Sequence, residues 1–247
     1  MKPEKIRRAR AEGKRRAGWV AAGVLAVLCA DGCATGNYQK ADAASESLRR
    51  ASLQIDAENH AIDLALARLD DLVGHPAPDL KPQFKQFSAS VDRLVDASQR
   101  AEKAATAANE KSNEYFRNWD REMASINFEA VREQSVSRKT QVSSEFNTVN
   151  QRYRENQAVV EPLIFYLQDI RTALSTDLTR GGVEAVKPLA DNATQNARKV
   201  QGALGRLTAD MSASRTQISS VVLRESEAKG GIVDATQTTQ ERAQSSP

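Results

Sequence analysis

The strongest constraint on this chain is a set of long stripes in which apolar or small residues recur at alternating steps of three and four. This spacing puts the side chains on one face of an α-helix, whereas a strand would need alternating apolar and polar residues. Three of the stripes run from Phe84 to Trp119, from Val142 to Leu174 and from Val186 to Val221. The first stripe contains Leu48, Ser52, Ile55, Asn59, Ile62, Leu66, Leu69 and Val73. Spacing of this kind, sustained over many residues, predicts helices packed as a coiled coil.

The residues between the first and second stripes predict a helix end followed by a new start. Gly74, Pro76 and Pro78 follow the first stripe directly. Glycine suits the position just after a helix, and proline cannot continue one. We expect Asp79 to cap the second helix and Pro82 to lie in its first turn, where the missing N–H costs least.

Glycines and prolines also mark the second half of the chain. Gly181 and Gly182 are expected to separate the third helix from the fourth. Pro188 is expected in the first turns of the fourth helix. Pro162 is different because it falls inside the third stripe, where it predicts a kink.

The connection between the second and third stripes admits two readings. Residues 120–141 are largely polar, contain no glycine or proline, and shift the stripe out of phase. One reading is a turn at residues 125–128, with Asn127 capping the next helix. The other is a single rod over residues 83–178, about 140 Å long at 1.5 Å per residue. We favour the turn, because a bundle buries each stripe more fully.

The expected fold is therefore all-α: an elongated antiparallel helical bundle, or coiled coil, of about four long helices. We expect the helical domain over residues 41–225, preceded by a tether at 34–40. Residues 226–247 are polar and rich in Thr, Gln and Ser, which predicts a disordered tail.

The first 33 residues have the features of an export signal. Residues 1–18 hold eight Lys or Arg against two Glu, and an uncharged run of 14 residues follows at 17–30. A helix of that length rises only about 21 Å, whereas a bilayer core is about 30 Å thick. A basic start, a short apolar run and small residues beyond it are typical of a secretory signal peptide.

Cys33 is the candidate lipidation site. The run Ala30-Asp31-Gly32-Cys33-Ala34 resembles the lipobox of bacterial lipoproteins, in which the cysteine receives the lipid and becomes the new N-terminus. The match is degenerate, since Ala30 stands where Leu is usual and Asp31 is charged. Cys29 follows Leu28 and is the poorer candidate. An uncleaved anchor, or a cleaved signal without lipid, are the alternatives. Ala34 after the cysteine, by resemblance to the lipoprotein sorting rule, favours the outer membrane over the inner one.

The charge distribution argues against nucleic-acid binding. The whole chain has a net charge of +3, but the basic excess lies in the export segment, and the rest is slightly acidic. A nucleic-acid-binding domain would carry its positive charge on the folded part. We therefore expect no nucleic-acid partner.

The sequence offers no recognisable catalytic or metal-binding set. His60 and His75 are the two histidines, and neither has other ligand types at a metal-binding spacing. We expect solvated histidines, no cofactor, no metal and no enzymatic activity. An enzyme that uses exposed carboxylates is the least favoured alternative.

Tyr115, Phe116 and Trp119 form the most aromatic part of the second stripe. We expect them to plug the bundle core. The alternative is a groove in which they contact a hydrophobic or peptidic ligand, or a partner protein.

Two segments resemble a known family. The run 113–122 contains Tyr115-Phe116 and Trp119 in the spacing YFxxW, and residues 161–174 begin Glu161-Pro162-Leu163. Both are similar to elements of a bacterial family of uncharacterised coiled-coil lipoproteins, domain-of-unknown-function (DUF) family 2959. The resemblance covers roughly residues 35–220 and implies an envelope location and a helical shape, with no established activity.

Together these features predict an exported envelope lipoprotein, anchored by its N-terminal lipid and facing the periplasm, in which a non-catalytic coiled-coil domain acts as scaffold, spacer or partner-binding protein. The alternative is a helical binding module with its ligand near Tyr115 and Trp119. A homodimer is also possible, since unused stripes could pair with a second copy.

Overall fold

The computed structural model describes residues 36–220, and in this part the chain is helical with short connections. The helices are α1 (Asn37–Gly74), α2 (Lys81–Ala124), α3 (Glu129–Thr176) and α4 (Arg180–Ile218). No strand occurs among these residues, so the expected all-α fold is confirmed. Residues 37–40, expected in the tether, belong to α1. The expected signal peptide (1–33) and tail (226–247) lie outside the described residues.

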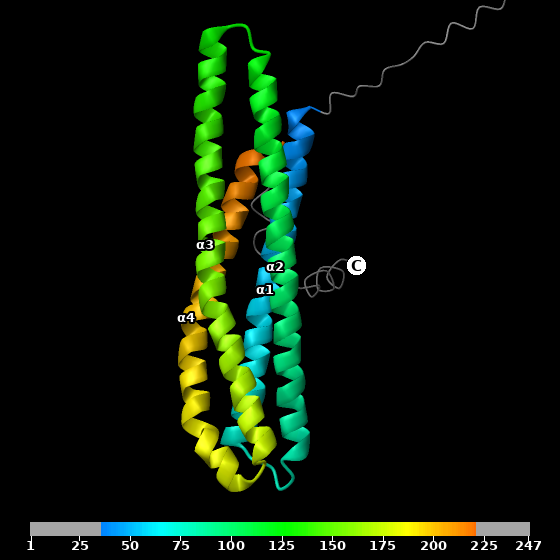
Figure 1. Ribbon diagram of the computed structural model, residues 1–247, viewed down its shortest axis with the longest axis vertical. Coiled ribbons are helices and arrows are strands. Elements are labelled where there is room, and N and C mark those ends of the chain that lie inside the picture. Colours follow the sequence, from blue (N-terminus) through cyan, green and yellow to red (C-terminus); the bar gives the residue numbers. More distant parts are fainter. Residues whose placement is uncertain (1–35, 221–247) are drawn as a thin grey trace, which may run out of the picture. The chain divides into compact units, whose positions relative to one another are not determined.

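The helices form a four-sided antiparallel bundle (Figure 1). α1 packs against α2 and α4, and α3 packs against the same two helices, so α1 and α3 lie diagonally. Successive helices run in opposite directions because the connections are short. α3 has 48 residues, which gives it a length of about 72 Å. The bundle is therefore much longer than it is wide.

The turn between α2 and α3 occupies residues 125–128, so of the two sequence readings the turn is right and the single rod is wrong. The expected cap is also wrong: Phe128, not Asn127, is the N-cap residue of α3, and no side chain caps this helix end. Phe128 is 78% exposed at this end of the hairpin.

The predicted stripes of α2, α3 and α4 line the core. The stripe of α4 is buried from Val186 to Ile218. In α1 the stripe was partly wrong: Ser52 and Asn59 are only half-buried, while Ala51 and Glu58 are buried. The buried seam shares Leu48, Ile55, Ile62 and Leu69 with the predicted stripe but joins them by the other order of three- and four-residue steps.

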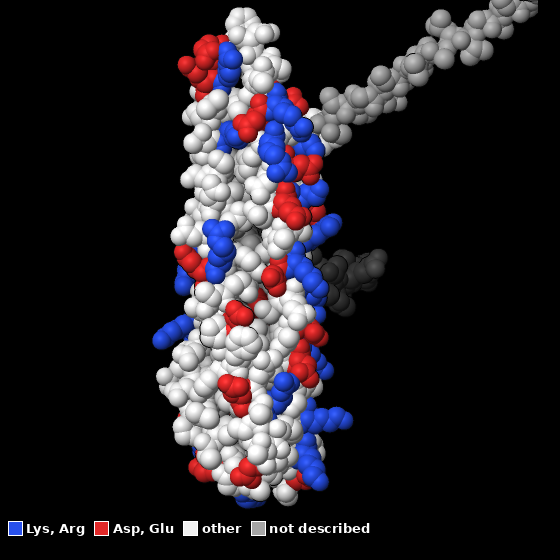
Figure 2. Space-filling view, viewed as in Figure 1, with Lys and Arg blue, Asp and Glu red and all other residues white. Residues whose placement is uncertain are grey.

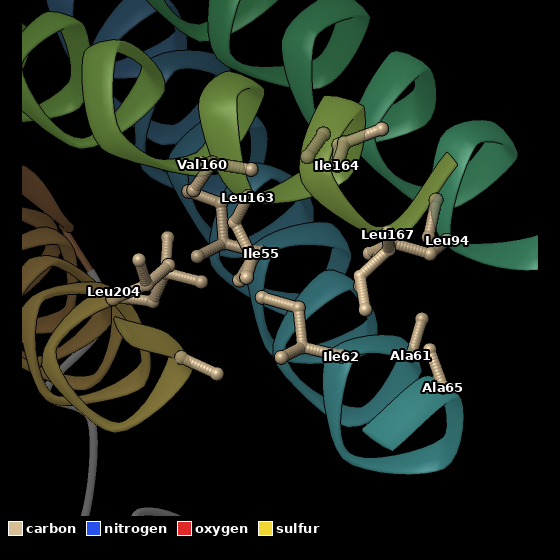
Figure 3. Close-up of a cluster of buried hydrophobic side chains, with 14 of the residues drawn as sticks. Ile55, Ala61, Ile62, Ala65, Leu94, Val160, Leu163, Ile164, Leu167 and Leu204 are labelled. Carbon is tan, nitrogen blue, oxygen red and sulfur yellow. The ribbon is translucent and has the colours of Figure 1, made fainter. Parts of the chain in front are cut away.

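The core is built from branched aliphatic side chains of several helices (Figure 3). Ile55 and Ile62 of α1 point toward Val160 and Leu163 of α3 and Leu204 of α4. Each of the five is at most 4% exposed. Burial of one such side chain stabilises a fold by roughly 1.5–3 kcal/mol, so this layer holds the diagonal helices together.

Polar pairs at the edges of the bundle join neighbouring helices. Lys40 of α1 pairs with Glu114 of α2, and the Gln201 amide of α4 donates to Asp63 of α1 at 2.6 Å. Arg171 of α3 pairs with Asp92 of α2 at 2.6 Å. Pairs at such exposed edges contribute about 0–1 kcal/mol each, so they add little to stability.

The turn between α1 and α2 is organised by Gln83. Its amide nitrogen donates to the backbone and side-chain oxygens of Asp71, at 3.1 and 3.0 Å, and to the His75 carbonyl at 3.0 Å. Its amide oxygen accepts from the Ala77 N–H at 2.9 Å. Pro82 lies in the first turn of α2 as expected, but Leu80 is the N-cap residue and Asp79 instead accepts from the Lys81 N–H at 3.1 Å.

The turn between α3 and α4 depends on close backbone packing. Thr179 caps α4, its hydroxyl accepting from the Gly182 N–H at 3.2 Å. A Cβ atom at Gly182 would lie 2.1 Å from the Asp177 carbonyl oxygen, whereas one at Gly181 would meet nothing closer than 3.7 Å. Both glycines lie inside the first turn of α4 rather than between the helices.

The two helix prolines lie deeper than at a helix start. Pro188 is in the interior of α4, not in its first turns as expected. Pro162 is in the interior of α3, and α3 bends along its length in Figure 1. Each proline removes one backbone hydrogen bond from its helix.

Replacing Gln83 should loosen the α1–α2 turn. Gln83→Ala removes four hydrogen bonds around backbone groups of the turn, which should lower the free energy of unfolding by roughly 1–3 kcal/mol. Denaturant unfolding followed by circular dichroism measures this. Gln86→Ala, an exposed glutamine on the same helix, is the control. Equal losses in both variants would contradict the role of Gln83.

The neighbouring glycines should respond in opposite ways. Gly182→Ala must displace the Asp177 carbonyl, and such overpacking should cost roughly 1–3 kcal/mol. Gly181→Ala has room for its methyl group and should be neutral or stabilising by up to about 1 kcal/mol. Thermal melting of the two variants tests this, and a Gly182→Ala variant as stable as Gly181→Ala would refute the close approach.

Candidate functional site

The three aromatic residues singled out from the sequence lie together on α2. The ring centroids of Tyr115 and Phe116 are 5.1 Å apart, and those of Tyr115 and Trp119 are 5.4 Å apart. Phe146 of α3 meets Phe116 edge-on at 5.3 Å. These distances are typical of favourable aromatic pairs. The cluster therefore joins α2 to α3 as one packed layer.

The polar atoms of this layer are also hydrogen-bonded or buried. The Trp119 indole N–H donates to the Ser135 hydroxyl of α3 at 2.9 Å. Burial raises the pKa of Tyr115 to about 12, against a smaller opposing effect of Arg138. The arrangement is that of a structural layer, and contact of Tyr115, Phe116 and Trp119 with a ligand or partner stays a prediction.

A polar clasp holds the start of α1 against α2 beside this layer. The Asn118 amide donates to the Asn37 side chain at 3.1 Å, and Arg121 donates to Asn118 at 2.9 Å. Lys40 and Lys111 both bind Glu114, and their hydrogen bonds lower the pKa of Glu114 to about 2. The first turn of the described chain is thus tied to α2.

The most unusual group in the described residues is Glu58, which the sequence analysis missed. Glu58 of α1 is 0% exposed, and neither carboxylate oxygen has a hydrogen-bond partner of normal geometry. Burial raises the pKa of Glu58; the Ser98 hydroxyl nearby opposes this only partly. The Ser98 hydroxyl lies near Glu58 but forms no hydrogen bond with either carboxylate oxygen.

Further buried polar atoms without a partner lie on α3, and one of them, the Tyr153 hydroxyl, is close enough to sense the charge of Glu58. Tyr153 of α3 has a buried hydroxyl without a partner, and the Gln157 amide nitrogen is in the same state. Burial is the main reason that the pKa of Tyr153 is raised, and the charges of Glu58 and Glu102 add to it. Asn156 reaches α4, where its amide donates to the Ala203 carbonyl at 3.4 Å. The middle of the bundle thus contains a polar layer.

A signal for Glu58 does exist in the sequence. The interval between Ile55 and Ile62 can be divided into steps of three and four in two ways, through Glu58 or through Asn59. Heptad spacing alone allows both, and because Glu58 and Asn59 are both polar, hydropathy does not predict which of them is buried. In the folded bundle Glu58 is buried and Asn59 is half-buried.

The histidines lie apart from these groups. His60 and His75 are both exposed. Within residues 36–220 no three His, Cys, Asp or Glu side chains gather closely enough to hold a metal ion. None of the helices in this range is long and apolar enough to cross a membrane. Cys33, the predicted lipidation site, lies outside the described residues.

The comparison with protein families identifies the chain. A family model described as "Protein of unknown function (DUF2959)" matches residues 36–223, about three quarters of the sequence. This protein belongs to that family. The resemblance carried by Tyr115, Phe116, Trp119 and the run from Glu161 is therefore confirmed at the level of the family. Neither the curated proteins nor the solved structures yield a match.

Glu58 should make stability depend on pH. Its folded-state pKa is raised above 4.5, so the folded state holds its proton more tightly than the unfolded state. The stability that this proton linkage adds is fully present below pH 4.5 and is lost as pH rises toward the folded-state pKa. Over that range the free energy of unfolding falls by on the order of 1 kcal/mol per pH unit. Glu58→Gln should flatten this slope.

Urea unfolding between pH 4 and 8 measures the effect. Glu102→Gln, which removes an exposed carboxyl group from α2, controls for the change in net charge. Burial raises the pKa of Asp56 as well, but Asp56 is present in all three proteins and cancels in the comparison. Parallel slopes for wild type and Glu58→Gln would show that Glu58 is not held neutral.

Proposed function

We propose that this protein is an exported bacterial envelope lipoprotein whose helical bundle serves as a non-catalytic scaffold or spacer in the periplasm. The main observation in support is that the start of α1 and the end of α4 lie side by side. The N–H and hydroxyl of Ser220, just after α4, donate to Asp42 near the start of α1 at 2.7–2.9 Å. The bundle itself extends for about 70 Å.

This geometry suits attachment by one end. Cys33 lies three residues before Gly36, where the described chain begins. A lipid on Cys33 would hold the chain near the start of α1, and the turns at 75–80 and 177–179 lie at the other end of the bundle (Figure 1). A rod of this kind can carry a surface away from its membrane, which is the physical basis of a spacer.

The partner-binding part of the proposal rests on the tip of the α2–α3 hairpin. Phe128 is 78% exposed there, and Val131 and Val136 of α3 are 57% and 45% exposed. α2 and α3 extend beyond the start of α1 in Figure 1, so the tip is not covered by the other helices and lies at the anchored end of the bundle, opposite the turns at 75–80 and 177–179. An envelope protein or a second copy of this chain is the kind of partner that would bury these side chains.

The anchor is tested by palmitate labelling of cells that produce the full chain. We expect label in the wild type and in Cys29→Ala, and at least a ten-fold loss in Cys33→Ala. Density-gradient fractionation should move Cys33→Ala out of the outer-membrane fraction. An unlabelled wild type, or a labelled Cys33→Ala, would refute the lipoprotein.

A further inference from the structure

A continuous groove runs along the outer side of the α3–α4 contact. A cavity of about 500 Å³ is lined by residues of both helices, among them Ala158, Pro162 and Val200. A second cavity of about 390 Å³ continues from it, because Val159 and Ala203 line both. Volumes in this range are typical of small-ligand sites.

The larger cavity has a mostly apolar lining. Val159, Leu163 and Tyr166 of α3 contribute to it, and Val159 is 46% exposed although it is aliphatic. Pro162 has no N–H to donate to the carbonyl one turn earlier, so one backbone hydrogen bond of α3 is missing beside the groove. In Figure 2 much of the surface over the lower part of α3 and α4 is uncharged. Water in such a groove is readily displaced by an apolar chain.

Two cations of α4 border this lining. Lys199 lines the larger cavity and Arg206 the smaller one. The Arg206 guanidinium folds back along α4, 3.6 Å from where a Cβ of Gly202 would lie, so it reaches one turn toward Lys199. Within residues 36–220 neither cation pairs with a carboxylate.

The acidic groups near the groove lie beside the smaller cavity and Arg206, not beside Lys199. Glu155 lines the smaller cavity and accepts from Gln151 at 2.9 Å. Asp210 pairs with Arg152. No carboxylate lines the larger cavity, so Lys199 is the only charge that borders it.

From this charge pattern we propose that the α3–α4 groove binds a single-chain anionic amphiphile, with its alkyl chain along Val159, Leu163 and Val200 and its anionic headgroup on Lys199, supported by Arg206. A fatty carboxylate is the simplest ligand of this class. The apolar cavity supplies the binding free energy through burial of the chain. The cations select for a negative headgroup, since charge-assisted hydrogen bonds are stronger than neutral ones. The site lies wholly within the described residues and does not depend on lipidation of Cys33.

The probe for the test is a 16-carbon fatty acid that carries a diazirine in its chain, added to the cell fraction that holds the full-length protein. After irradiation, tryptic peptides are analysed by mass spectrometry. Label should concentrate in the peptides Glu155–Arg171 and Val200–Arg206. The methyl ester of the same probe should label these peptides at least five-fold less, because it lacks the charge.

Variants separate the charge from the cavity. Lys199→Gln should reduce labelling of Glu155–Arg171 and of the peptide 199–206, which replaces Val200–Arg206 because trypsin no longer cleaves after position 199, at least five-fold. Arg198→Gln, a neighbouring exposed cation outside the groove, should leave labelling unchanged. Ala203→Leu should fill the groove at the point shared by both cavities and abolish labelling. Circular dichroism of each variant checks that the bundle is intact.

Three results would overturn the proposal. The first is equal labelling by the acid and its ester. The second is labelling only by a two-chain phosphatidylglycerol with the same diazirine, since the site is assigned to one chain. The third is a wild-type dimer in sedimentation that Ala203→Leu converts to a monomer, which would make the groove an interface between copies of this chain.

Discussion

Every helix of this bundle must bury one apolar face against two neighbours, and the choice of side chains for that face determines how close each pair can come. On α1 and α2 many of the buried residues are alanines, including Ala44 and Ala51 on one helix and Ala101 and Ala105 on the other. Alanine loses no side-chain entropy on burial and allows close approach of the backbones, but each methyl group buries little area. On α3 the buried residues are mostly Val, Leu and Ile. The two sides of the bundle therefore follow different packing rules.

The polar layer at Glu58 gives the bundle a feature that pure heptad packing lacks. A buried carboxyl group without a partner destabilises the fold, because its desolvation is not offset. Its cost is least when the group holds its proton, which is the direction in which burial moves its pKa. Polar residues at core positions can fix the alignment of helices, since a shifted alignment would bury them in a worse place. Glu58, Tyr153 and Asn156 come from α1 and α3, the diagonal pair, and so restrict the alignment that the edge pairs alone would set weakly.

Much of the fold could be predicted from spacing, and the parts that could not have identifiable causes. The stripes placed nearly all of the core of α3 and α4, because apolar residues at heptad positions, large on α3 and often alanine on α4, leave one solution. Spacing could not choose between Glu58 and Asn59, since both are polar and both fit. The predicted helix caps were wrong for a related reason. Asn127 and Asp79 have side chains that suit an N-cap, but the geometry of each turn places Phe128 and Leu80 at the N-cap positions instead. Gln83 makes four hydrogen bonds that exist only in the folded turn, and no sequence pattern around residue 83 predicts them.

The same contrast in packing bears on the groove between α3 and α4. Alanines on both partners let the α1 and α2 backbones meet closely, which leaves little space along their contact. Between α3 and α4 the larger residues of α3 meet the alanines of α4, such as Ala193 and Ala197, and Pro162 adds a bend to α3. Pro162, which removes one hydrogen bond from α3, lies in the wall of the cavity along this contact. The space left open lies beside Lys199. Stripes of α3 and α4 that have ordinary coiled-coil spacing therefore enclose a cavity with a charged border.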